Sequence, residues 1–187
     1  MDGVKYTDIM IDLETTGTQP DRTAILQIAA VKFNLETREV CPEFFDRCLT
    51  IPKHRFWQKD TMEWWGKQKR GVLNDIMSRA EPYRDVINQF ADYSYQNPGL
   101  RFWSKPTTFD FMFLASYFSD EDLINPFHYR VATDMNSFLK GLHYPNPAPE
   151  IQVDFSADAH NALNDTLWQL KTLFAHLDKK NETNTSI

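Results

Sequence analysis

The chain has 187 residues, a length typical of a single domain with a full hydrophobic core. It carries 26 acidic and 20 basic residues, which give a formal net charge of −6. This balance disfavours general binding to duplex DNA, because neutralising phosphates requires an excess of Lys and Arg. Carboxylates that hold divalent cations would still let an acidic chain handle nucleic acid.

The cysteines and the N-terminus favour a reducing, cytoplasmic compartment. Cys41 and Cys48 are the two cysteines, and their odd separation would point them to opposite faces of one strand. We therefore expect no disulfide bridge between them, and their spacing is not that of a zinc site. Residues 1–8 show no signal-peptide pattern, and no apolar run reaches the ~18 residues that a membrane span needs.

The predicted elements begin with strands and continue with helices. The apolar run Ile9-Met10-Ile11 predicts a buried strand over 6–13, bounded by a polar turn. Two more strands follow after short turns, so we expect a meander over 6–13, 24–33 and 40–51. Beyond them we predict helices over 60–69 and 82–95, a short strand over 100–104, helices over 108–118 and 131–141, and a proline-rich loop over 143–155.

The last helix has the clearest pattern. Spacings of four and three residues place one apolar stripe at Leu163, Leu167, Leu170, Phe174 and Leu177. We expect this helix to close a single domain over 1–178, followed by a polar, disordered tail at 179–187. Strands first, then helices interleaved with a strand, indicate an α/β fold with helices packed on a mixed sheet.

Asp12 and Glu14 are the first candidates for chemistry. They lie two residues apart at the end of a predicted strand, so their side chains point to the same face. Two carboxylates held this close are costly unless a cation joins them, and hard oxygen ligands suit Mg²⁺ or Mn²⁺. A helix cap or a surface turn after the strand is the alternative interpretation.

Asp110, His160 and Asp165 are the other candidates. Asp110 lies in the first turn of a predicted helix, where the helix dipole alone would favour an acidic residue. His160 and Asp165 would be about 140° apart on a helix, so they cannot share one helix face. Their spacing makes sense if Asn161 caps the helix and His160 lies just before it. A structural histidine is the alternative.

A basic and aromatic segment covers residues 53–70. It has six Lys or Arg against two acidic residues, a local charge of +4, interleaved with tryptophans. Such a mixture is typical of a groove for single-stranded nucleic acid, and equally of an ordinary helix face. We expect one of Trp64 and Trp65 to be buried.

In chain order, Asp12-x-Glu14, Asp110 and His160-x4-Asp165 resemble the three motifs of the DEDDh 3′–5′ exonucleases. The resemblance covers about 6–178. Within the family, the chain is similar to a small phage and bacterial branch of 3′–5′ exoribonuclease-like proteins. It also rests on residues 43–47, on 60–65 and on Phe102-Trp103-Ser104-Lys105 before Asp110. The resemblance implies a ribonuclease-H-like fold with a mixed five-stranded sheet flanked by helices.

The resemblance also implies a two-cation site. Asp12, Glu14, Asp110 and Asp165 would hold two divalent cations, Mg²⁺ or Mn²⁺, and His160 would be the general base. The residues against the substrate would be Leu13, Thr15, Thr16, Phe109 and Asn161.

The function implied is a metal-dependent 3′–5′ exonuclease that releases nucleoside 5′-monophosphates. Its partners would be 3′ ends of single-stranded DNA or RNA, with no membrane and a possible homodimer. Two alternatives stay open: a nucleic-acid-binding module without turnover, and an endonuclease that cuts internally, as ribonuclease H does.

Overall fold

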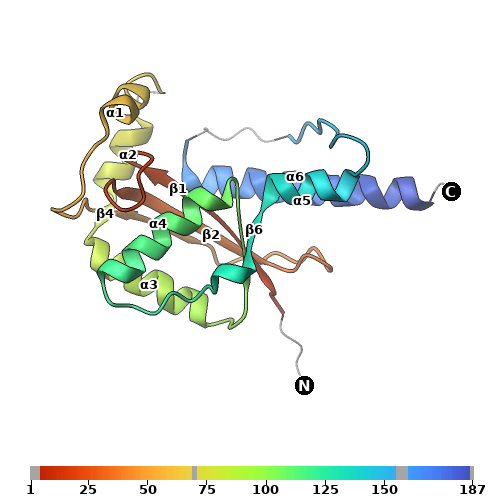
Figure 1. Ribbon diagram of the computed structural model, residues 1–187, viewed down its shortest axis with the longest axis horizontal. Helices are drawn as coiled ribbons and strands as arrows, with labels where there is room; N and C mark the ends of the chain where they lie inside the picture. The colour runs from red at the N-terminus through yellow and green to blue at the C-terminus, as the bar shows by residue number, and fades with distance from the viewer. Residues whose placement is uncertain (1–4, 69–70, 155–159, 186–187) are drawn as a thin grey trace.

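A six-stranded mixed sheet forms the middle layer of the molecule (Figure 1). The computed structural model describes residues 5–68, 71–154 and 160–185. The strands lie in the order β4-β3-β2-β1-β5-β6. They comprise β1 (Asp8–Thr15), β2 (Ile25–Phe33), β3 (Phe45–Leu49), β4 (Ala80–Glu81), β5 (Arg101–Ser104) and β6 (Ala132–Asp134). The helices are α1 (Lys59–Trp65), α2 (Val72–Ser78), α3 (Tyr83–Tyr95), α4 (Thr107–Asp120), the 3₁₀ turn η1 (Tyr129–Val131), α5 (Met135–His143) and α6 (Ala162–Thr185).

The first three strands form the expected meander. β1 pairs antiparallel with β2, and β2 pairs antiparallel with β3. β5 then adds parallel to the other side of β1, and β6 adds parallel to β5. A ribonuclease-H-like α/β fold is therefore confirmed, but the sheet has six strands where five were expected. The sequence pattern located four of these strands and missed β4 and β6, which have two and three residues and are too short to give a periodic pattern.

Alternation along β1 divides the core into two layers. Ile9, Ile11 and Leu13 pack with residues of α3 and α4 on one face of the sheet. Met10 packs on the other face, with residues of α5 and α6 such as Leu170. Figure 1 shows these helix pairs on opposite sides of the strands. Because neighbouring side chains alternate, Asp12 and Glu14 share the face of Met10 and point toward α6.

Three segments differ from the prediction. The helix expected over 131–141 begins only at Met135, because Asp134 ends β6 and caps α5 by accepting from the Ser137 N–H at 2.8 Å. The short helix α2 was not predicted. Helix α6 continues to Thr185 although a disordered tail was expected at 179–187; Lys179, Lys180 and Glu182 in this segment are good helix formers.

Two smaller predictions concern the cysteines and the membrane. Cys41 and Cys48 are both free and buried, as expected. Among the described residues, no helix is long and apolar enough to cross a bilayer.

Candidate metal centre

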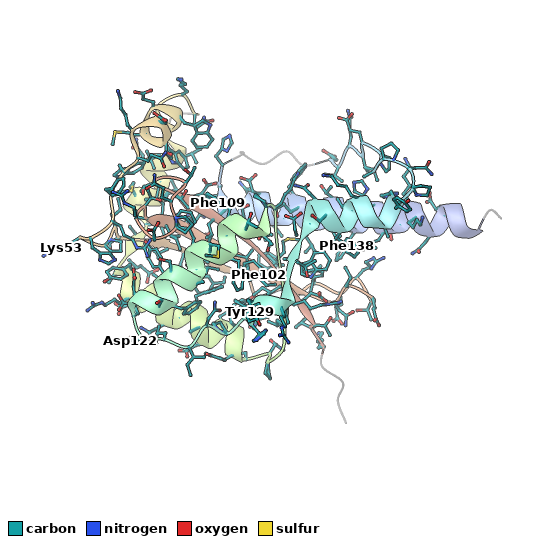
Figure 2. All side chains as sticks on the ribbon, viewed as in Figure 1. Lys53, Phe102, Phe109, Asp122, Tyr129 and Phe138 are labelled. Carbon is teal, nitrogen blue, oxygen red and sulfur yellow. The ribbon has the colours of Figure 1, made fainter. Side chains whose placement is uncertain are left out.

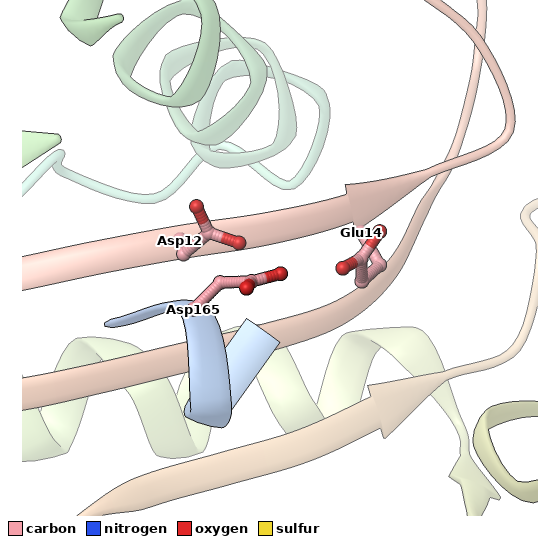
Figure 3. A group of neighbouring side chains, drawn as sticks. All are labelled: Asp12, Glu14 and Asp165. Carbon is pink, nitrogen blue, oxygen red and sulfur yellow. The ribbon is translucent and has the colours of Figure 1, made fainter. Parts of the chain in front are cut away.

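Three carboxylates meet at the end of β1. Asp12 and Glu14 come from the strand, and Asp165 comes from the first turn of α6. One oxygen of each side chain lies within 4.8 Å of the others, and Figure 3 shows the three groups turned toward one another. Oxygen ligands gathered in this way can coordinate a hard divalent cation.

Asp110 adds a fourth carboxylate from the first turn of α4. Its side chain is buried, and burial raises its pKa to about 7. It lies close enough to Asp12 for its negative charge to raise the pKa of that group. The structure therefore brings together three of the four acidic residues that the sequence singled out, and the fourth, Asp110, lies near enough to act on Asp12 electrostatically.

Burial and mutual repulsion keep these carboxyl groups from ionising easily. The pKa of Asp12 is raised well above its ordinary value, first by burial and then by Asp110, Glu14 and Asp165. Burial and the charges of Asp165 and Asp110 raise the pKa of Glu14 to about 8. A bound cation would remove this penalty, so the donor set and its electrostatics fit divalent metal ions.

Gln169 holds Asp12 from the next turn of α6. Its Nε2 donates to Oδ1 of Asp12 at 2.7 Å, a contact that favours the charged carboxylate. The side chain is buried, and its Oε1 has no hydrogen-bond partner among the described residues. Such an amide fixes the orientation of a carboxylate ligand, as residues behind metal ligands commonly do.

The start of α6 is fixed by three hydrogen bonds. The Ala162 N–H donates to Oε1 of Gln27, a buried residue on β2 directly opposite Glu14. The Asn164 N–H donates to the Asn161 side chain at 3.3 Å, so Asn161 caps the helix as predicted. In the third bond, the backbone N–H of His160 donates to Oδ2 of Asp165 at 3.0 Å.

His160 lies outside helix α6, which begins at Ala162, as expected. Its φ angle of 64° is in the left-handed region, which turns the chain immediately before α6. Its ring meets the ring of Trp64 edge-on, with centroids 4.7 Å apart. His160 therefore lies between α1 and the four carboxylates, here called the acidic cluster (Asp12, Glu14, Asp110 and Asp165).

Helix α1 is tied closely to the end of β1. The Trp65 indole N–H donates to the Thr15 carbonyl at 3.0 Å, and the Gln58 N–H donates to the Thr16 carbonyl at 2.9 Å. Trp65 is buried whereas Trp64 is exposed, so the prediction that one of the pair is buried is confirmed. The buried tryptophan anchors the helix, and the exposed one contacts the histidine.

A cavity of about 340 Å³, here called the α1 pocket, opens between α1 and the end of β1. It is lined by Glu14 of the acidic cluster and by three residues expected to touch the substrate, Leu13, Thr15 and Phe109. The other two residues expected to touch the substrate, Thr16 and Asn161, are not among the residues that line this pocket. Thr16 is fully buried, and its hydroxyl donates to the Phe56 carbonyl; Asn161 caps α6.

The basic and aromatic segment 53–70 stabilises the fold and also lines part of the α1 pocket. The guanidinium of Arg55 is buried and donates to Pro20, Thr23, Ser116 and Asp120. Lys59 forms an exposed pair with Glu63. Residues 69–70 of this segment lie outside the described part of the chain.

The sequence interpretation missed three supporting residues: Gln27, Gln169 and the specific role of Trp64. Gln169 follows Asp165 by four residues, so helical spacing alone places both on one face and offered a signal. Gln27 is opposite Glu14 only in the strand register, which the sequence did not supply.

Comparisons by sequence match most of the chain to known proteins. The family model for the 3′–5′ exoribonuclease Rv2179c-like domain matches residues 7–177. An exodeoxyribonuclease of Enterobacteria phage T4 is 28% identical in an alignment of length 136 that covers 63% of this chain and 58% of the phage enzyme. The chain thus matches little more than half the length of that relative.

Two solved structures share the fold. The nuclease domain of 3′hExo, a DEDDh family member bound to rAMP, has a TM-score of 0.65 and 17% identity, with 95% of this chain and 94% of that chain covered. Exonuclease I of E. coli in complex with a dT13 oligonucleotide has a TM-score of 0.69 and 14% identity, covering 95% of this chain and 42% of that chain.

Proposed function

The chain belongs to the Rv2179c-like 3′–5′ exoribonuclease domain family, and on that premise we propose that it is a metal-dependent 3′–5′ exonuclease. It removes nucleotides from the 3′ end of single-stranded nucleic acid and releases nucleoside 5′-monophosphates. The observation that carries the proposal is the meeting of three carboxylates from β1 and α6, with Asp110 of α4 near enough to act on Asp12, beside a pocket of about 340 Å³.

The acidic cluster is the proposed seat of the cations. Asp12, Glu14 and Asp165 would hold Mg²⁺ or Mn²⁺ through the oxygens that already face one another, and Asp110 would support the site from α4. Two bound cations would stabilise the negative charge that develops on the attacking and leaving oxygens. The chain itself supplies the rigid placement, through Gln169 behind Asp12.

His160 is the proposed general base. In its neutral form an imidazole nitrogen takes the proton of the water that attacks the scissile phosphorus. The backbone N–H of His160 is held by Asp165, and its ring is held against Trp64. The base is thereby kept beside the carboxylates.

The α1 pocket is the proposed site of the 3′-terminal nucleoside. Phe109 and Trp64 offer aromatic surface for a base, while Thr15 and Glu14 lie at the end of the pocket nearest the acidic cluster. Exonuclease I, which shares the fold, was solved with a dT13 single strand. That complex supports a single-stranded substrate, and the family name supports RNA.

The test is digestion of matched 5′-labelled single-stranded RNA, single-stranded DNA and duplexes with Mg²⁺ or Mn²⁺. We expect a ladder that shortens from the 3′ end and mononucleotide products, and we expect Asp12→Asn to abolish it. His160→Ala should lose about 10²–10⁴ in turnover but still bind Mn²⁺. Cuts in mid-chain would replace the proposal with an endonuclease, and binding without products would replace it with a binding module.

A further inference from the structure

A second, larger cavity lies between α5, α6 and the loop at 148–153. Its volume is about 640 Å³, and it is here called the α5–α6 pocket. Among the described residues it shares no lining residue with the α1 pocket. The proposed mechanism so far gives it no role.

One stripe of α6 connects this pocket to the acidic cluster. Trp168, Thr172 and His176 line the pocket, and they follow Asp165 at spacings of three, four and four residues. Such residues lie on one face of a helix, about 5 Å apart along its axis for each turn. The pocket therefore continues along α6 from the point where Asp165 joins the other carboxylates.

The opposite wall of the pocket begins next to the same cluster. Lys105 lies in the turn between β5 and α4, five residues before Asp110. Its Nζ is 4.8 Å from the centroid of the Trp168 ring, within the range of a cation–π contact. A positive charge and an indole ring thus meet at the end of the pocket nearest the carboxylates.

The remaining lining is also suited to a polyanion with aromatic bases. Lys140 of α5 adds a second cation to the half-buried Lys105 and is itself exposed, and Glu150 is the one acidic side chain that lines the cavity within the described residues. Cations that meet phosphates, together with rings on which bases stack, are what single-stranded nucleic acid requires of a protein surface.

We propose that the α5–α6 pocket binds the strand upstream of the scissile phosphate. The proposal rests on the proposed exonuclease function, because it needs the scissile phosphate at the acidic cluster and the terminal nucleoside in the α1 pocket. The strand then leaves the cluster on the other side, where Lys105 meets a phosphate and Trp168 stacks on a base. Lys140 meets a phosphate further along.

Substrates of different length separate this pocket from the chemistry. The p-nitrophenyl ester of thymidine 5′-monophosphate has no upstream nucleotide, whereas an eight-residue oligothymidylate fills the pocket. Trp168→Ala should raise KM for the octamer at least about fivefold, the lower limit for losing one stacked base, and leave ester hydrolysis unchanged. Trp168→Phe, which keeps a ring, should restore most of the loss.

Lys105→Ala tests the phosphate contact. It should weaken the octamer and also reduce the slope of log kcat/KM against log salt by about 0.7, the value for one phosphate of a single strand. Lys5→Ala and Tyr129→Ala are matched controls: Lys5 is exposed and precedes β1, at the opposite end of that strand from Glu14, and Tyr129 is exposed and lies away from α6 (Figure 2). They should change neither the KM for the octamer nor the salt slope.

Three results would overturn the proposal. Trp168→Ala with an unchanged KM for the octamer would show that no base stacks there. An equal loss on the ester and on the octamer would mean that Trp168 acts through Asp165 on the same helix. Loss of octamer affinity in Lys5→Ala equal to that in Lys105→Ala would reduce the effect to net charge.

Failure of the exonuclease proposal is distinguishable from failure of this one. If the wild-type protein hydrolyses neither substrate, the affinity for a 5′-fluorescein oligothymidylate is measured by anisotropy in Ca²⁺. About fivefold weaker binding by Trp168→Ala would then keep the pocket as a strand-binding site in a protein without turnover. Equal binding by the two proteins would overturn it.

Discussion

Replacing Glu14 with Gln should stabilise the protein when no metal is bound. In the folded chain burial and the neighbouring carboxylates raise the pKa of Glu14 from 4.5 to about 8. At neutral pH this carboxyl group is ionised in the unfolded chain. In the folded chain it must either take up a proton or remain charged in a buried site, and both alternatives lower the free energy of unfolding. Because Gln cannot ionise, the variant escapes that penalty.

The magnitude follows from proton linkage. A carboxyl group whose folded pKa is raised causes no penalty below its unfolded pKa, and the penalty grows as pH rises toward the folded value. With pKa values of 4.5 and about 8, the wild-type free energy of unfolding should fall on the order of 2–3 kcal/mol between pH 5 and pH 7 from this group alone. The penalty should reach its full size above pH 8.

The assay is thermal or urea unfolding in a chelator between pH 5 and pH 8. Glu14→Gln should show a weaker decline of stability with pH than the wild type, and should be more stable at pH 7.5. The exposed Glu36 provides the matched control, since Glu36→Gln makes the same chemical change outside the cluster. A variant at position 14 that is less stable than wild type at pH 7.5, or a wild-type stability that does not fall with pH, would refute the reasoning.

Three further predictions follow from the same contacts. Gln169→Leu removes the amide that holds Asp12 and should weaken Mn²⁺ binding about 10–100-fold by calorimetry; unchanged affinity would count against a positioning role. Gly17→Ala would bring a Cβ within 2.4 Å of a Thr23 side-chain carbon, so the free energy of unfolding should fall by about 1–3 kcal/mol in melts with chelator. Trp64→Ala should lower kcat at least tenfold through loss of the contact with His160, whereas Trp64→Phe should keep most of it; equal loss in both would contradict edge-on ring support.

The residues of the acidic cluster could be identified from the sequence because the patterns that indicate them involve only residues close together in the chain. The alternation of β1 puts Asp12 and Glu14 on one face, and a capping residue before α6 separates His160 from Asp165. Each rule needs only neighbouring residues. The meeting of these motifs in space came from the resemblance, and the strand order provides its physical reason.

Other features depend on contacts between distant segments. Strands β4 and β6 exist because longer neighbours offer them free edges, so their own few residues give no pattern. The hydroxyl of Thr16 donates to the Phe56 carbonyl, 40 positions away, a contact that the sequence pattern does not reveal. The hold of Gln27 on the start of α6 likewise joins residues 135 positions apart.

The most direct test of the acidic cluster as the site of catalysis compares the wild type with Asp12→Asn. Calorimetry at pH 7.5 measures Mn²⁺ binding by each protein. The same preparations are then assayed on a 5′-labelled single strand. We predict saturable binding and 3′-end shortening by the wild type, and loss of both in the variant. Undiminished Mn²⁺ binding or shortening by Asp12→Asn would contradict the account.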